Sequence, residues 1–113
     1  MIFRAALLAT TLILPLSALA ANTGAVDAGK AKSVICQACH GADGNGIGDP
    51  QYPLLAGQFP DYLAKALRDY KSGERDNAIM KGFASTLSDQ DMLDLAAYFA
   101  AQPTKLRDLQ GIH

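Results

Sequence analysis

The residues best suited to chemistry lie in one short run. Cys36 and Cys39 are separated by two residues, and His40 follows the second thiol. This C-x-x-C-H spacing is typical of covalent haem attachment. Each thiol can add to one of two neighbouring vinyl groups of the porphyrin, which brings the next imidazole under the ring, where a nitrogen can bind iron. The chain has two cysteines in all, so the run uses both.

Three other chemistries use the same thiols. A dithiol redox centre usually accompanies a βαβ pattern, which this sequence lacks. Structural zinc takes four ligands, and the one other histidine, His113, is the last residue. A plain disulfide would suit an exported protein. We favour haem, because the adjacent histidine fits it and the rivals leave a distant methionine unexplained.

Methionine matters because haem iron in electron carriers is often held by histidine on one side and methionine on the other. A soft thioether raises the reduction potential. Met92 falls in the apolar stripe of an expected helix, where core packing is the ordinary role of methionine. Met80 lies in a stretch, 74–86, that we expect to be irregular. The chemistry therefore favours Met80, with Met92 or an open or water-bound iron as alternatives.

Helical patterns surround these residues. A first helix is expected over 26–37, running into the haem motif, and a glycine-rich loop follows over 41–51. Pro60 suits the first position of a second helix and Gly73 its end.

A third helix is expected to begin after Ser88, with Asp91 completing a capping box, and to stop before Pro103. Its buried stripe is predicted to be Met92, Leu95, Ala96 and Phe99. No β alternation or internal repeat is present, so the fold class is all-α and the domain is small and single.

Residues 1–20 have the pattern of a secretory signal peptide. Arg4 precedes an apolar run, Pro15 interrupts it, and an Ala-x-Ala site ends at Ala20. The alternative is an uncleaved anchor, but the run is short for a membrane-spanning helix. Cleavage would leave a domain over 21–113 in the periplasm, with nine basic against eleven acidic residues. This balance argues against nucleic-acid binding, and we expect no stable membrane insertion after cleavage.

The sequence resembles the class I cytochromes c, especially small bacterial periplasmic ones with a single haem. The likeness covers the whole mature chain and rests on five segments in order: 36–41, 52–58, 79–82, 87–91 and 95–99. The resemblance implies a small cytochrome c fold in which three main helices wrap around one covalently bound haem c and its iron.

The resemblance also assigns the ligands. It implies that Cys36 and Cys39 carry the thioether bonds, that His40 is the proximal iron ligand and that Met80 is the distal one.

Supporting residues follow from the same likeness. Pro53 resembles the proline whose carbonyl accepts a hydrogen bond from the proximal histidine, which fixes the imidazole's orientation. Leu55 resembles a leucine packed on the haem face. Gly29 resembles the glycine at which the first and last helices cross. Ser33 stands where the family often has an aromatic residue, which predicts a looser crossing.

These features predict a soluble periplasmic one-electron carrier and not an enzyme. The alternative is a haem-bearing subunit of a larger oxidoreductase. The expected partners are redox proteins such as respiratory complexes, oxidases or dehydrogenases.

Overall fold

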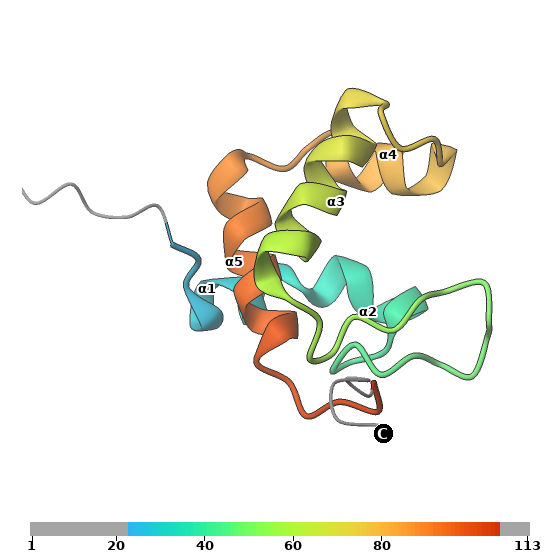
Figure 1. Cartoon of the computed structure of the whole chain (residues 1–113), viewed down its shortest axis with the longest axis vertical. Coiled ribbons are helices and arrows are strands. Elements are labelled where there is room, and N and C mark those ends of the chain that lie inside the picture. The colour runs from blue at the N-terminus through green and yellow to red at the C-terminus, as the bar shows by residue number, and fades with distance from the viewer. Residues whose placement is uncertain (1–22, 107–113) are drawn as a thin grey trace, which may run out of the picture.

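The computed structural model describes residues 23–106, and this part of the chain contains five α-helices and no strand (Figure 1). The helices are α1 (Val26–Lys32), α2 (Val34–His40), α3 (Pro60–Ser72), α4 (Ala78–Ala84) and α5 (Asp89–Ala100). The all-α prediction is confirmed, with five helices where the sequence predicted three main ones. The expected signal peptide and His113 lie outside the described residues.

The expected single helix over 26–37 is wrong in one respect, because it is divided into α1 and α2 at Ser33. The Ser33 hydroxyl donates to the carbonyl of Lys30 at 2.8 Å, and the Cys36 amide donates to the Ser33 carbonyl at 2.8 Å. Serine side chains compete in this way for backbone groups of a helix. The break lets α2 set its own direction before it ends at His40.

The predicted ends of α3 and α5 are confirmed. Pro60 is the first residue of α3, and Gly73 ends it in the left-handed conformation with φ of 88°. At α5, the Ser88 hydroxyl accepts from the Asp91 amide at 3.1 Å, and the Ser88 amide donates to the Asp91 carboxylate at 2.9 Å. This is the capping box expected from the sequence.

The stretch 74–86 is not irregular throughout, because it contains α4. The side chain of Asn77 caps this helix by accepting from the Met80 amide at 2.9 Å. Asparagine is a strong N-cap residue, so Asn77 was the available sequence signal. The helix was missed because it spans only seven residues and contains Gly82, a poor helix former.

Helix α5 is the centre of the core. It packs against both α1 and α3, while α4 packs against α3 (Figure 1). The predicted stripe of α5 is buried, with Met92, Leu95, Ala96 and Phe99 each at most 3% exposed. Within residues 23–106 no helix has the length and apolar character needed to cross a membrane.

The crossing of α1 and α5 depends on Gly29, as the resemblance implied. A Cβ at this position would overlap the Asp94 carbonyl and would lie 2.7 Å from the Cβ of Tyr98. The two backbones are therefore in direct contact here, in spite of Ser33. Gly24 makes a similar approach to the backbone of Leu93, which the sequence analysis did not anticipate.

A buried carboxylate completes this crossing. Helix α1 has no side-chain cap of its own, and Asp94 of α5 instead accepts from the Ala25 amide at 2.8 Å. The same carboxylate, 3% exposed, accepts from Lys32 at 2.6 Å and from Gln90 at 2.8 Å. The hydrogen bond from Lys32 is the largest cause that lowers the pKa of Asp94, to about 2. Asp94 of α5 thus caps the N-terminus of α1.

The glycine contacts predict opposite effects for two substitutions. Gly29→Ala should destabilise the protein by roughly 1–3 kcal/mol, because the new methyl group forces two packed backbones apart. Gly82→Ala, in the same kind of helical position, should stabilise it by about 0.5–1 kcal/mol, because nothing lies within 4 Å of its Cβ. Urea denaturation of both variants measures this, and equal effects would contradict the close crossing.

The low pKa of Asp94 predicts a dependence of stability on pH. Because the folded pKa lies below the ordinary 3.8, the carboxylate stabilises the fold above about pH 4, and this contribution is lost as the pH falls toward 2. Asp94→Asn should lower Tm at neutral pH and flatten the loss of stability between pH 4 and pH 2. Asp89→Asn is the matched control, since that side chain is 78% exposed. Indistinguishable acid titrations of the two variants would refute the role of Asp94.

Candidate functional site

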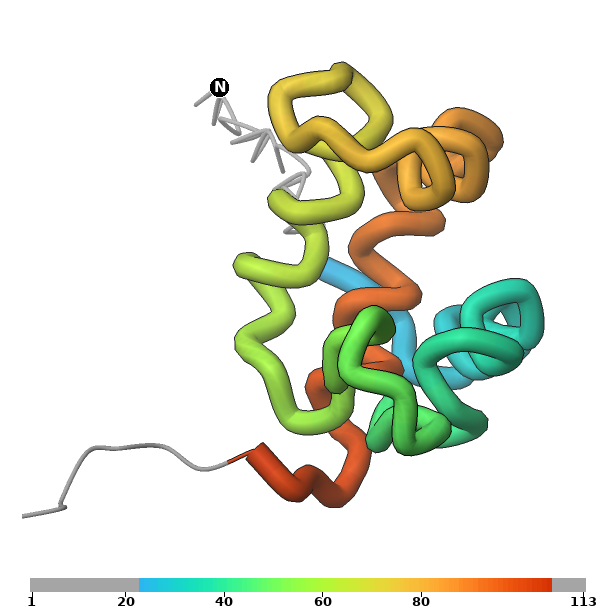
Figure 2. Tube along the Cα trace, turned by 90° about the vertical axis from the view of Figure 1, so that its right-hand side faces the viewer, coloured from blue at the N-terminus to red at the C-terminus, as the bar shows by residue number. Residues whose placement is uncertain are grey.

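One cavity of about 600 Å³ lies among α2, the 51–58 segment, α3, α4 and α5. In Figure 2, α2 and α4 lie toward the right of the view, with α4 above α2, and α3 runs along the left. The volume falls within the usual range for cofactor sites, about 300–1,000 Å³. All six residues singled out from the sequence line this cavity: Cys36, Cys39, His40, Pro53, Leu55 and Met80.

His40, the last residue of α2, is 6% exposed and is held by both its side chain and its backbone. Its Nδ1 lies 2.8 Å from the carbonyl oxygen of Pro53. A carbonyl can only accept, so Nδ1 carries the proton and the lone pair of Nε2 is left to bind a metal. The His40 carbonyl accepts from the Gly46 amide at 2.8 Å. The hydrogen bond that the resemblance implied between His40 and Pro53 is thus present.

The glycine-rich loop holds the Pro53 segment beside α2. The Gly44 carbonyl accepts from the amides of Leu55 at 2.7 Å and Ala56 at 3.1 Å. Gly44 has φ of 80°, and a Cβ there would lie 2.8 Å from the Phe99 ring and 2.9 Å from the Ala56 amide nitrogen. Only glycine fits this backbone and this space. The loop therefore places the carbonyl that orients His40.

The two thiols are half-buried and are not joined to each other. Burial raises the pKa of the Cys36 thiol to about 11, so its thiolate is scarce at neutral pH. Reactive dithiol centres have lowered thiol pKa values instead. Over residues 23–106 no three His, Cys, Asp or Glu side chains group as a metal site would require. These observations weigh against the dithiol and zinc alternatives.

The two methionines among residues 23–106, Met80 and Met92, have different surroundings. Met80 is half-buried on α4 and lines the cavity. Met92 is completely buried in the core cluster of α5 and is not among the cavity residues. Only Met80 is therefore available to a group held in the cavity.

Sequence reasoning missed the polar part of the lining. Among the described residues that line the cavity, Arg75 is the one Lys or Arg, and none is Asp or Glu. Its guanidinium donates to the Tyr62 hydroxyl at 3.4 Å and lies 4.9 Å from the centroid of the Tyr70 ring. Tyr62 and Tyr70 are eight residues apart, a spacing that places both on one face of α3. It could not reveal that this face borders a cavity.

The model of the family described as cytochrome c matches residues 26–102. The chain belongs to the cytochrome c family. It is 49% identical over 96 residues to cytochrome c4 of Pseudomonas aeruginosa, which covers 85% of this chain and 47% of the relative. It is 43% identical over 82 residues to cytochrome c-554(548) of Halomonas halodenitrificans, which covers 70% of this chain and 98% of the relative.

A solved structure gives the same relationship. The crystal structure of reduced recombinant cytochrome c4 from Pseudomonas stutzeri matches with a TM-score of 0.69 and 42% identity, over 74% of this chain and 48% of that one. The chain thus spans about half the length of its cytochrome c4 relatives and nearly the full length of the shorter relative.

Membership of the cytochrome c family implies a covalently bound haem c, which is an iron porphyrin. The cavity fits such a group. It offers two thiols at the attachment spacing, an imidazole with a free Nε2 and a thioether from another helix. One cation and no carboxylate in the lining also suit a cofactor that carries propionates. Apolar side chains of α3 and α5, such as Leu63, Leu67 and Phe99, complete the lining.

Proposed function

We propose that the protein is a periplasmic cytochrome c that carries one electron at a time on a single haem. The observation that carries the proposal is the convergence of both thiols, His40 and Met80 on one cavity, with His40 oriented by Pro53. Cys36 and Cys39 hold the thioether bonds, and His40 and Met80 bind the iron. When bound, haem c supplies an iron that is reversibly reduced by one electron.

The protein's own residues set how that iron behaves. The hydrogen bond from His40 to Pro53 fixes the imidazole and increases its basicity. The Met80 thioether favours the ferrous state and occupies the position that a substrate or gas would need. Leu55, which lines the cavity, would pack against the porphyrin and keep water from it. A closed ligand set of this kind suits electron transfer and opposes catalysis.

Partners and location belong to the same proposal. Residues 1–20 have the pattern of an export signal, and haem attachment suits an exported protein. The partners are other redox proteins, such as oxidases or dehydrogenases. A haem-bearing subunit of a larger oxidoreductase is the second candidate, because the chain is similar to a solved thiosulfate dehydrogenase (TsdBA) from Marichromatium purpuratum, with 26% identity and a TM-score of 0.61 over 78% of this chain and 21% of that one. Size measurement and co-purification from the native host distinguish the two.

Thioether attachment predicts that the colour of the purified protein stays with the polypeptide during acid–acetone extraction. Cys36→Ser and Cys39→Ser should each reduce the yield of haem-loaded protein and its helicity, because the cofactor fills a large part of a small core. Haem content and circular dichroism measure this.

Ala38→Ser is the matched control, since this exposed residue lies between the two thiols without touching the cavity. It should load haem normally. Pigment in the organic phase from the unmodified protein would refute covalent attachment.

The positions of the methionines predict which one binds iron. Met80→Ala should abolish the weak near-infrared band of sulfur–iron bonding, lower the potential and open the iron to cyanide or carbon monoxide. Absorption spectra with and without these ligands, together with a redox titration, test this expectation.

Met92→Leu is the control, because it changes a buried methionine outside the cavity. It should keep the band and cost less than about 1.5 kcal/mol of stability, since the volume is nearly conserved. Loss of the band in Met92→Leu alone would reverse the assignment. Ready binding of carbon monoxide by the unmodified protein would instead favour a sensor or an enzyme.

A further inference from the structure

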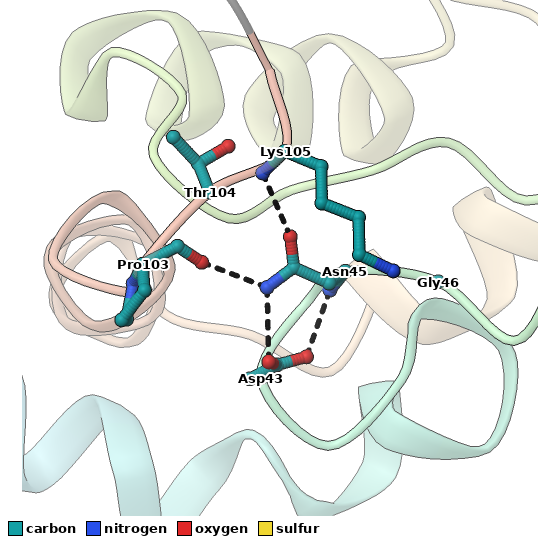
Figure 3. Close-up of a pocket in the computed structure, with 6 residues that line it drawn as sticks. All are labelled: Asp43, Asn45, Gly46, Pro103, Thr104 and Lys105. Atoms are coloured by element: carbon teal, nitrogen blue, oxygen red, sulfur yellow. Dashed lines mark hydrogen bonds between the residues drawn. The ribbon is translucent and has the colours of Figure 1, made fainter.

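The side chain of Asn45 links the glycine-rich loop to the segment that follows α5 (Figure 3). Its amide nitrogen donates to the Pro103 carbonyl at 2.7 Å and to the Asp43 carboxylate at 2.9 Å. Its amide oxygen accepts from the Lys105 amide at 3.1 Å. Both donor hydrogens and the acceptor oxygen of the amide are therefore used. The bonds to Pro103 and Lys105 each join residues more than fifty positions apart in the sequence.

The neighbours of Asn45 in sequence hold the histidine side of the cavity. Gly46 donates its amide to the His40 carbonyl at 2.8 Å. Gly44 accepts the amides of Leu55 and Ala56, which follow Pro53. The loop residues on either side of Asn45 thus bond to His40 itself and to the residues two and three positions after Pro53.

The segment after α5 also contacts the far end of the Pro53 segment. Thr104 lies so close to Gly57 that a Cβ at Gly57 would overlap it, and the Gly57 amide donates to the Phe99 carbonyl at 2.9 Å. Residues 103–105 are therefore fixed between the glycine-rich loop and Gly57. Asn45 is the one side chain among the described residues that hydrogen-bonds to the backbone of this segment from the loop.

We propose that Asn45 is a positioning residue for the His40 imidazole. By joining the loop to residues 103–105, it holds the Pro53 carbonyl at hydrogen-bond distance from Nδ1 of His40. It does so without touching the cavity, because neither Asn45 nor its partners Asp43, Pro103 and Lys105 are among the residues that line it. The inference rests on the proposed role of His40 as an iron ligand.

The physical consequence is a change in the strength of that ligand. A hydrogen bond from Nδ1 increases the basicity of the imidazole, and a more basic ligand stabilises ferric iron. Loss of the link would let the Pro53 segment move away and weaken this bond. The ferrous form would then gain relative to the ferric form, so the midpoint potential would rise.

The test compares Asn45→Ala with the unmodified protein, both loaded with haem and both well below Tm. The midpoint potential should rise, and the Nδ1 proton of His40, followed by NMR in the ferrous protein, should exchange with solvent several times faster. Asn45→Gln, which keeps an uncharged amide but displaces it by one methylene, should give a smaller shift in the same direction. This second variant serves if Asn45→Ala folds poorly.

Gln102→Ala is the matched control. It removes an uncharged side-chain bond to the Tyr98 carbonyl, 2.8 Å long, next to the same segment but without contact to the loop. Its potential and proton exchange should equal those of the unmodified protein. A lower Tm in Asn45→Ala with unchanged potential and exchange would overturn the proposal, as would an equal shift in Gln102→Ala. The absorption spectrum of the unmodified protein is recorded first. If it shows no haem, both the proposed function and this proposal are overturned.

Discussion

The hydrogen bond from His40 to Pro53 is the interaction on which the site depends, because it joins two segments that come together only through the loop between them. An imidazole at the end of a helix has a freely rotating side chain until its second nitrogen is bound. The bond of 2.8 Å selects one tautomer and one ring orientation, and so directs Nε2 toward the cavity. The compact glycine-rich loop makes this bond possible, because the Gly44 carbonyl accepts hydrogen bonds from the segment that follows Pro53.

The crossing of α1 and α5 supports that arrangement from behind. Gly29 brings the two backbones into contact, and Asp94 supplies the helix cap that α1 lacks. With α1 fixed on α5, the break at Ser33 sets where α2 begins, and hence where Cys36 and Cys39 stand. A thioether link to a rigid porphyrin requires both sulfurs at fixed places. The polar network at Asp94 therefore contributes to the shape of the cavity, although Asp94 is not among the residues that line it.

Local rules explain which parts of this fold could be read from the sequence. The caps at Pro60, Gly73 and Ser88 follow from residue chemistry alone, and the prediction of α3 and α5 is confirmed for that reason. The division at Ser33 and the short α4 each depend on a single side-chain hydrogen bond. The periodicity of apolar residues cannot show whether such a bond forms. The site was read mainly from the attachment spacing and the family resemblance. Arg75 was missed because no local pattern distinguishes a surface arginine from one beside a cofactor cavity.

The two sides of the cavity are built with unequal rigidity, and this bears on how the proposed ligands differ. On the histidine side, backbone bonds from Gly44 and Gly46 tie α2, the loop and the Pro53 segment into one unit. On the methionine side, α4 has seven residues, begins at the single cap of Asn77 and packs against no described helix except α3. A thioether is also a weaker ligand for ferric iron than an imidazole is. Bond strength and scaffold therefore act in the same direction. Under the proposed assignment, His40 would stay bound in both oxidation states of the iron, and Met80 would be the ligand whose loss costs the fold least.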